Sequence, residues 1–228
     1  MANDSKLTAD CYSRGERTGM IRFQQLRAYL LGPLLRSLAY LRITANHVTL
    51  LSLILGLSFC LVWWESPRWA MLCLLLHVLL DGLDGPVARQ QETASARGSL
   101  TDSMCDQLVV TASMIVLMVA ERVDIVAGSI YIFSYAMVVA FAMVRNALDE
   151  PYSWVARPRF VIYVWLALDL WFLEPAGWTG TCTYLLWICN AALCFKMITG
   201  FFAIRRSLVR WALSSIRRLT PTLSECGM

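Results

Sequence analysis

The apolar residues of this sequence are gathered into long blocks that carry almost no charge. Val48–Trp64 and Ile125–Val144 hold no charged residue, and hydrophobic residues make up 58% of the 228-residue chain, against 16% charged. A soluble domain of this length needs more charge to cover its surface, whereas a helix in a bilayer needs about 20 consecutive apolar residues. The sequence therefore predicts an all-α integral membrane protein.

Six transmembrane helices are expected between residues 46 and 204, where the apolar blocks lie. Their expected bounds are Val48–Trp64, Trp69–Ala88, Thr101–Ala120, Ile125–Val144, Phe160–Leu173 and Pro175–Ile204. Before them, residues 20–42 mix many leucines with four arginines, a pattern typical of an amphipathic helix in the membrane interface. Residues 1–19 are expected to form a polar N-terminal tail without a cleavable signal, and residues 205–228 a basic cytoplasmic tail.

Two of the expected spans are long enough only when aspartates are counted as part of them. The twelve residues before Asp81 and the fourteen residues after Asp106 lack charge, but neither run crosses a hydrocarbon core of about 30 Å at about 1.5 Å per residue. Each span reaches twenty residues by including two carboxylates, Asp81 and Asp84 in one and Asp102 and Asp106 in the other. Ionisable residues inside a membrane usually mark a functional site.

Positively charged residues are distributed unevenly between the two sides that six spans define. Seventeen Lys and Arg residues fall in the N-terminal region, the 89–97 loop, the 145–159 segment and the C-terminal tail, whereas the opposite loops hold only Arg68 and Arg122. Segments rich in Lys and Arg stay in the cytoplasm. We therefore expect both termini and the 89–97 loop to be cytoplasmic in this multi-pass protein.

The four aspartates form two matched layers at one end of a helical hairpin. Each pair shares one helix face, because Asp81 and Asp84 are three residues apart and the other two are four apart. Counted inward from the 89–97 loop, Asp84 matches Asp102 in depth and Asp81 matches Asp106. Carboxylates this close repel without a cation between them, and an all-oxygen ligand set favours Mg²⁺, Mn²⁺ or Ca²⁺. His77, one turn deeper, is interpreted as a packed, hydrogen-bonded histidine rather than as a ligand.

Small residues and one arginine accompany the carboxylates. Gly85, Ala88 and Gly98 remove side-chain bulk beside them, which lets a flat or bulky ligand approach the backbone. Close packing of membrane helices explains small residues equally well. Arg89 adds a charge suited to phosphate oxygens. Together with carboxylate-bound cations, these residues are suited to a diphosphate substrate.

The stretch from Asp81 to Asp106 resembles the signature of the CDP-alcohol phosphotransferase family, D-x2-D-G-x2-A-R-x8-G-x3-D-x3-D. Every fixed position of that signature is present, namely Asp81, Asp84, Gly85, Ala88, Arg89, Gly98, Asp102 and Asp106. The segment T-A-N-H-V-T, with Asn46 and Thr49, is similar to the family's entry into its first span. Six spans after an interfacial helix also match the architecture of the family.

The resemblance implies a role for each of these residues. In that family the aspartates hold two divalent ions, so Asp81, Asp84, Asp102 and Asp106 are implied to bind two Mg²⁺ or Mn²⁺ ions, with Asp106 also the general base. The implied CDP-binding residues are Gly85, Ala88, Arg89, Gly98, Asn46 and Thr49. The implied activity transfers the phosphatidyl group of CDP-diacylglycerol to a small alcohol in phospholipid biosynthesis and releases CMP. The implied assembly is a homodimer in the lipid membrane, with no nucleic acid partner.

Basic residues near the expected cytoplasmic ends of the fourth and fifth spans bear on the acceptor. Arg145, Arg157 and Arg159 lie roughly where family members with phosphorylated acceptors carry basic residues. This favours inositol phosphate, inositol or glycerol 3-phosphate as acceptor over serine or an amino alcohol. The positive-inside distribution explains arginines there equally well, and the sequence leaves both interpretations open.

A divalent-cation or proton transporter is the alternative from a different functional class. Such a protein also needs carboxylates in the membrane, but it usually spreads polar residues over the whole membrane depth. Here the acids cluster in one half of one hairpin, together with Arg89 and small residues for which a transporter has no need. A catalytically silent scaffold has no need of all four acids. The pattern favours the enzyme.

Overall fold

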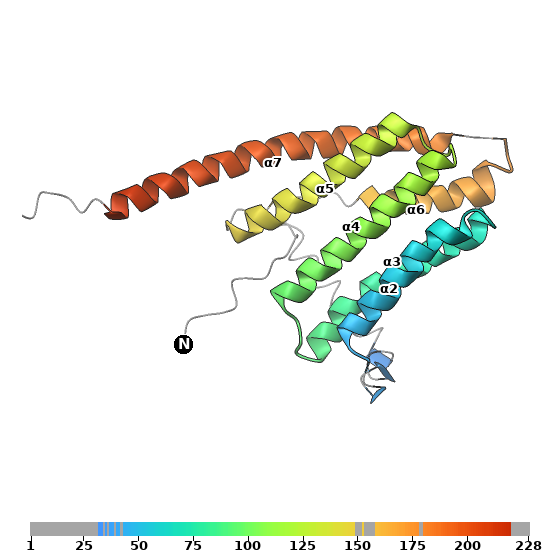
Figure 1. Ribbon diagram of the computed structural model, residues 1–228, viewed down its shortest axis with the longest axis horizontal. Coiled ribbons are helices and arrows are strands. Elements are labelled where there is room, and N and C mark those ends of the chain that lie inside the picture. Colours follow the sequence, from blue (N-terminus) through green and yellow to red (C-terminus); the bar gives the residue numbers. More distant parts are fainter. Residues whose placement is uncertain are drawn as a thin grey trace, which may run out of the picture.

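The described part of the chain consists of long helices and contains no strand (Figure 1). A computed structural model describes residues 43–148, 158–177 and 180–219, together with Tyr152 and scattered positions between 32 and 41. The helices are α2 (Ala45–Val62), α3 (Pro67–Gln90), α4 (Ala96–Val119), α5 (Ile125–Ala147), α6 (Pro158–Leu168), the π-helix η2 (Asp169–Leu173) and α7 (Thr181–Leu219). The predicted all-α class is confirmed.

Five of the described helices are long and apolar enough to cross a bilayer. They are α2, α3, α4 from Arg97 onward, α5, and the Thr181–Arg210 part of α7. The fifth expected span corresponds to α6 and η2, whose 11 and 5 residues reach about 24 Å at about 1.5 Å per residue. The expected count of six therefore stays a prediction, and the expected interfacial helix at 20–42 falls mostly outside the described residues.

Local capping residues fix the ends of the helices that carry the aspartates. Pro67 begins α3, at a helix position where the missing N–H costs nothing. The Ser95 hydroxyl accepts a hydrogen bond from the Gly98 backbone N–H at 3.1 Å and so caps the start of α4. Glu92, between the two helices, takes a left-handed backbone conformation with φ 56°. This short turn returns the chain, so the two aspartate pairs lie at neighbouring helix ends.

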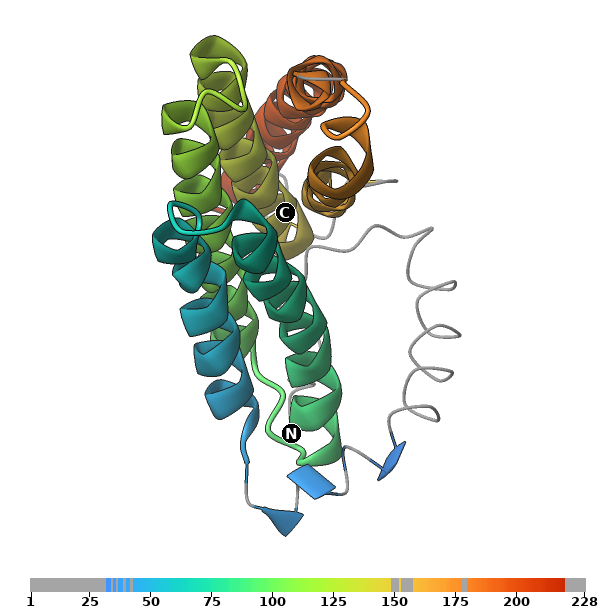
Figure 2. The same cartoon turned by 90° about the vertical axis from the view of Figure 1, so that its right-hand side faces the viewer.

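The packing of the bundle relies on α2, which lies against both α3 and α4. Gly56 of α2 permits this approach, because a Cβ there would lie 2.6 Å from Val109 of α4 and 3.1 Å from the His77 ring of α3. Phe59, Met71 and Leu74 fill the core at this junction. On the other side of the molecule α5 packs along α7 (Figures 1 and 2). Each aspartate-bearing helix thus packs extensively on α2.

Large apolar side chains also cover much of the outer surface. Leu50, Leu61, Leu79, Phe133 and Phe195, which come from four different helices, are all exposed. A soluble protein rarely exposes apolar patches of this extent, whereas a lipid-facing surface requires them. The outer surface therefore agrees with the membrane setting that the sequence predicts.

The last helix, α7, continues well beyond the expected sixth span. It runs for 39 residues without interruption, which is about 58 Å at about 1.5 Å per residue. Figure 1 shows it extending past the ends of the other helices. The first part of the basic segment that was expected as a tail from residue 205 is helical, because α7 continues as far as Leu219.

Candidate metal centre

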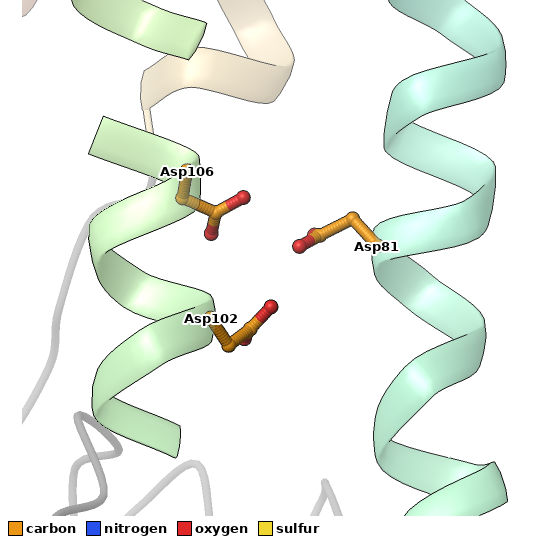
Figure 3. A group of neighbouring side chains, drawn as sticks. All are labelled: Asp81, Asp102 and Asp106. Carbon is orange, nitrogen blue, oxygen red and sulfur yellow. The ribbon is translucent and has the colours of Figure 1, made fainter. Parts of the chain in front are cut away.

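Three aspartates from two facing helices converge on one point. Asp81 lies on α3, and Asp102 and Asp106 lie one turn apart on α4. Figure 3 shows Asp81 pointing across to the two aspartates of α4. One carboxylate oxygen from each residue lies within 4.8 Å of the others. This spacing suits oxygen ligands around a single divalent cation.

The fourth aspartate, Asp84, completes the cluster on its outer side. Asp84 is buried, and its carboxyl group is in contact with that of Asp102, while the carboxyl groups of Asp81 and Asp106 contact each other. These contacts follow the two layers that were counted from the loop. The Thr49 hydroxyl of α2 donates a hydrogen bond to Asp84 Oδ2 at 2.9 Å, which fixes the orientation of this carboxylate.

The donor set fits a divalent metal centre. Four carboxyl groups this close repel one another strongly when they are ionised away from water, and the four oxygen-bearing side chains offer the ligands that Mg²⁺ and Mn²⁺ accept. The residues that would hold such ions are therefore Asp81, Asp84, Asp102 and Asp106. These are the four residues that the sequence predicts as ligands, and their role as ligands stays a prediction.

Arg159 also belongs to this cluster, a contact that the sequence did not predict. Its guanidinium Nη2 lies 2.9 Å from Asp81 Oδ2, and its Nη1 forms an ion pair with Asp106 Oδ2. The arginine is 4% exposed and enters from the first turn of α6. The sequence placed Arg159 with the acceptor arginines, since nothing in the sequence shows which neighbour the first turn of α6 faces.

His77 lies on the inner side of the cluster. Its ring is buried, with Nδ1 2.8 Å from the Ser52 hydroxyl and 3.1 Å from the Ser52 carbonyl oxygen. The other ring nitrogen, Nε2, lies 3.9 Å from Asp106 Oδ1. His77 is thus packed and hydrogen-bonded, as expected, but it also faces a carboxylate, which was not expected.

The residues expected to bind CDP lie around the outer end of the carboxylate cluster. Thr49 contacts Asp84 directly, whereas Asn46 is exposed in the first turn of α2. Gly85 and Ala88 are half-buried, and the Arg89 guanidinium lies beside Gly85, 3.5 Å from where a Cβ would stand. Gly98 lies in the first turn of α4, next to its capping Ser95.

The three arginines expected to bind the acceptor do not lie together in the described part of the chain. Arg145 stacks on the ring of Tyr152, with its Cζ 4.2 Å from the ring centroid, and Lys196 Nζ lies 5.7 Å from the same centroid. The Tyr152 hydroxyl donates to the Lys196 carbonyl oxygen at 3.2 Å, and burial raises the pKa of the Tyr152 phenol. Arg159 lies with the aspartates instead, and Arg157 lies outside the described residues.

Comparison with known proteins gives consistent results at three levels. Residues 42–203 match the CDP-alcohol phosphatidyltransferase family. The bifunctional IPC transferase and DIPP synthase of Aquifex aeolicus (strain VF5) is 38% identical over 68 residues, which are 30% of this chain and 16% of that protein. This chain therefore aligns with only a small part of that relative.

Two solved structures share the fold. Phosphatidylinositol phosphate synthase (PgsA1) of Mycobacterium tuberculosis with CDP-DAG bound has a TM-score of 0.63 at 18% identity, over 75% of this chain and 92% of that chain. The structure of the same enzyme in complex with manganese and citrate has a TM-score of 0.62 at 18% identity, over 75% of this chain and 87% of that chain. The matched family region includes every aspartate of the cluster and covers more than half of the sequence, so this chain belongs to the CDP-alcohol phosphatidyltransferase family.

Proposed function

We propose that the protein transfers the phosphatidyl group of CDP-diacylglycerol to the hydroxyl group of a small anionic alcohol and releases CMP. The observation that carries this proposal is the convergence of Asp81, Asp102 and Asp106 within 4.8 Å between two membrane helices of a chain from this family. The Mycobacterium synthase, which shares the fold, was solved with CDP-DAG bound, and this supports the same lipid donor here.

The aspartates have separate tasks in this reaction. Asp81, Asp84 and Asp102 are the proposed core metal ligands, and the Mg²⁺ or Mn²⁺ ions held there, two by family resemblance, would neutralise the diphosphate of the donor. Asp106 takes the proton of the acceptor hydroxyl. The hydroxyl oxygen then bonds to the lipid-side phosphorus, and the bond from that phosphorus to the CMP oxygen breaks. Products are the phosphatidyl alcohol and CMP, with the proton left on Asp106.

The proposed CDP-binding residues orient the outer carboxylate, contact the nucleotide phosphates or leave space for the nucleotide. Thr49 holds Asp84 through a hydrogen bond of 2.9 Å, so the outer carboxylate keeps a fixed orientation toward the metal. Arg89 is exposed at the outer end of α3, where its guanidinium is suited to phosphate oxygens of the nucleotide. Gly85 and Ala88 present no long side chains there, and Asn46 and Gly98 border the same end of the site.

The acceptor is proposed to be anionic because two positively charged side chains lie against the same aromatic ring. Arg145 and Lys196 both lie against Tyr152, and a cationic pair of this kind suits a phosphate group. Inositol phosphate and glycerol 3-phosphate are therefore the preferred acceptors. The name of the Mycobacterium enzyme that shares the fold, phosphatidylinositol phosphate synthase, supports the first of these. Arg157 remains a proposed acceptor residue on its sequence position alone.

Two further features are proposed from the sequence pattern and the resemblance. The site faces the cytoplasm, because seventeen Lys and Arg residues lie on that side and two on the other. The protein forms a homodimer, as the family resemblance implies.

An acceptor panel tests the proposed reaction. Purified protein is incubated with CDP-diacylglycerol, Mn²⁺ or Mg²⁺, and one of inositol phosphate, inositol, glycerol 3-phosphate, serine or ethanolamine, and CMP and the lipid product are measured. We expect turnover with a phosphorylated acceptor. Absence of CMP release with every acceptor contradicts the enzyme assignment, and metal-dependent ion flux in liposomes would then favour a transporter.

A matched pair of variants tests the role of the carboxylates. Asp102→Asn removes a proposed metal ligand and should abolish turnover. The control is Asp124→Asn, because Asp124 lies outside the cluster and caps α5 by accepting a hydrogen bond from Ala127 N–H at 2.9 Å. Asparagine caps a helix as well as aspartate does, so this control should keep full activity. Equal activity in the two variants contradicts the proposed site.

A further inference from the structure

The hydrogen bonds around His77 determine which of its ring nitrogens is free to bind a metal. The Ser52 carbonyl oxygen, 3.1 Å from Nδ1, can only accept a hydrogen bond. The Ser52 hydroxyl donates to the His77 carbonyl oxygen at 3.0 Å, so this hydroxyl also acts as an acceptor toward Nδ1. Both contacts require the proton on Nδ1. In the neutral ring, Nε2 therefore carries the lone pair.

The free nitrogen is directed at the carboxylate cluster. Nε2 lies 3.9 Å from Asp106 Oδ1, which is too far for a hydrogen bond. Two ligand atoms on an octahedral ion with bonds of about 2.1 Å are about 3.0 Å apart when adjacent and about 4.2 Å apart when opposite. The observed separation matches neither ideal value but is shorter than the opposite-ligand distance, so one cation can contact both atoms at a bond angle between the two ideal ones.

The packing around His77 keeps the ring in this orientation. His77 is 2% exposed, and Gly56 of α2 lies against its ring, so that a Cβ there would be 3.1 Å from His77 Cγ. Asp106 divides its two oxygens between partners, with Oδ2 facing Arg159 and Oδ1 facing His77. The side of Asp106 that faces His77 is therefore not the side that the arginine occupies.

We propose that His77 is a nitrogen ligand of the metal centre, and that it binds the cation beside Asp106. His77 and Asp81 are four residues apart on α3, so they share a helix face. Metal-bound histidines almost always donate their other ring N–H to a backbone carbonyl, a carboxylate or a water, which is the arrangement made with Ser52 here. This inference rests on the proposed divalent-metal site and adds a ligand to it.

The proposal has a consequence for metal preference. Carboxylates alone suit Mg²⁺ and Mn²⁺ alike, whereas an imidazole nitrogen favours first-row transition cations over Mg²⁺. We therefore expect Mn²⁺ to bind more tightly than Mg²⁺. In His77→Gln, Mn²⁺ affinity should fall by about tenfold or more, and Mg²⁺ affinity should fall less.

Pulsed EPR of bound Mn²⁺ tests the nitrogen ligand directly and without reference to turnover. Untagged full-length protein in a nitrogen-free detergent is loaded with Mn²⁺ in the absence of nucleotide. We expect the nitrogen modulation of a coordinated imidazole in the unmodified chain, and its change when the protein is labelled with ¹⁵N-histidine. The labelling needs no substitution, so the result does not depend on whether a variant folds.

Variants then assign the nitrogen. The sequence contains two histidines, His47 and His77, so the modulation should disappear in His77→Gln and persist in His47→Gln. Mn²⁺ that binds without nitrogen modulation, or modulation that persists in His77→Gln, overturns this inference and leaves the carboxylate site standing. Failure of the unmodified chain to bind Mn²⁺ overturns both the inference and the proposed metal site.

Discussion

The ion pairs of Arg159 allow a quantitative prediction about the carboxylate cluster. Replacing Arg159 with methionine keeps much of the side-chain length but removes the guanidinium that contacts Asp81 and Asp106. The two carboxylate side chains are 12% and 15% exposed, and the arginine side chain is 4% exposed. The substitution therefore leaves two nearly buried acids without their cation.

The expected loss of stability follows from this burial. Removing one partner of a buried ion pair costs about 3–5 kcal/mol, because the remaining charge is left uncompensated. For a chain of 150–250 residues, about 1 kcal/mol lowers the melting temperature by about 2–4 °C. Arg159→Met should therefore melt about 6–20 °C below the unmodified protein in metal-free detergent. Arg159→Lys should lose less, because lysine keeps the charge but not the two-pronged geometry.

Metal titration distinguishes this explanation from a general packing defect. A divalent cation in the cluster supplies positive charge to the same carboxylates, so Mg²⁺ or Mn²⁺ should raise the melting temperature of Arg159→Met more than that of the unmodified chain. The control is Arg122→Met. Arg122 forms an ion pair with Glu174, in which the two side chains are 28% and 38% exposed, and such a surface pair contributes at most about 1 kcal/mol. Equal melting temperatures of the two variants would refute the proposed role of Arg159. So would a metal ion that raises the melting temperature of Arg159→Met no more than that of the unmodified chain.

Three other substitutions test the remaining parts of the structure. Asp106→Asn should keep CDP-lipid binding in an equilibrium assay but lose CMP release, since an amide cannot take the acceptor proton; normal turnover excludes Asp106 as the base. Gly56→Val should force α2 away from Val109 and lower stability by about 1–3 kcal/mol, which a thermal melt would show; an unchanged melting temperature contradicts the close approach. Thr181→Val removes the hydroxyl that donates a hydrogen bond to the buried Asp169 at 2.6 Å and should lower the free energy of unfolding by about 1–3 kcal/mol. The control is Thr183→Val, on the same turn of the helix, which should lower it less.

The clustering of the four aspartates was predictable from the sequence, because it depends on residue type and helix spacing. Asp81 and Asp84 occupy one helix face and Asp102 and Asp106 another, and the short turn between the helices sets their depths. Both relations depend only on residue spacing along one helix, which can be counted in the sequence. The contacts between Asp84 and Asp102 and between Asp81 and Asp106 therefore followed from counting residues.

The contacts that come from other helices were not predictable in the same way. Arg159 and Ser52 reach the cluster from α6 and α2, and their rotation about the helix axis depends on packing that a single sequence does not record. Gly56 gives a weak signal, since a glycine in an apolar helix favours close approach without naming the partner. The expected position of Arg159 in the acceptor site shows this limit, because the charge was recognised and its neighbour was not.

Helix lengths were predicted less well than helix positions. The apolar run at Phe160–Leu173 corresponds to a short α-helix followed by a π-helix turn, Asp169–Leu173. There the buried Asp169 carboxylate accepts a hydrogen bond from Thr181, a partner that sequence periodicity does not reveal. At the other end of α7, the sixth span was expected to end at Ile204, but the helix continues through the arginines from position 205, because charge alone does not end a helix.

The helix α7 is longer than the hydrocarbon core is thick, so its basic end extends beyond the core. Of its roughly 58 Å, about 30 Å suffices for the hydrocarbon core, so about 28 Å of continuous helix is left over. The chain enters α7 on the face opposite the 89–97 loop, since Thr183 contacts the start of α5. The excess length with Arg205, Arg206 and Arg210 therefore projects on the same face as the carboxylate cluster. Arginines at that level attract anionic headgroups by about 1 kcal/mol each. The basic end of α7 is therefore placed to attract the anionic lipid donor that we propose for this site.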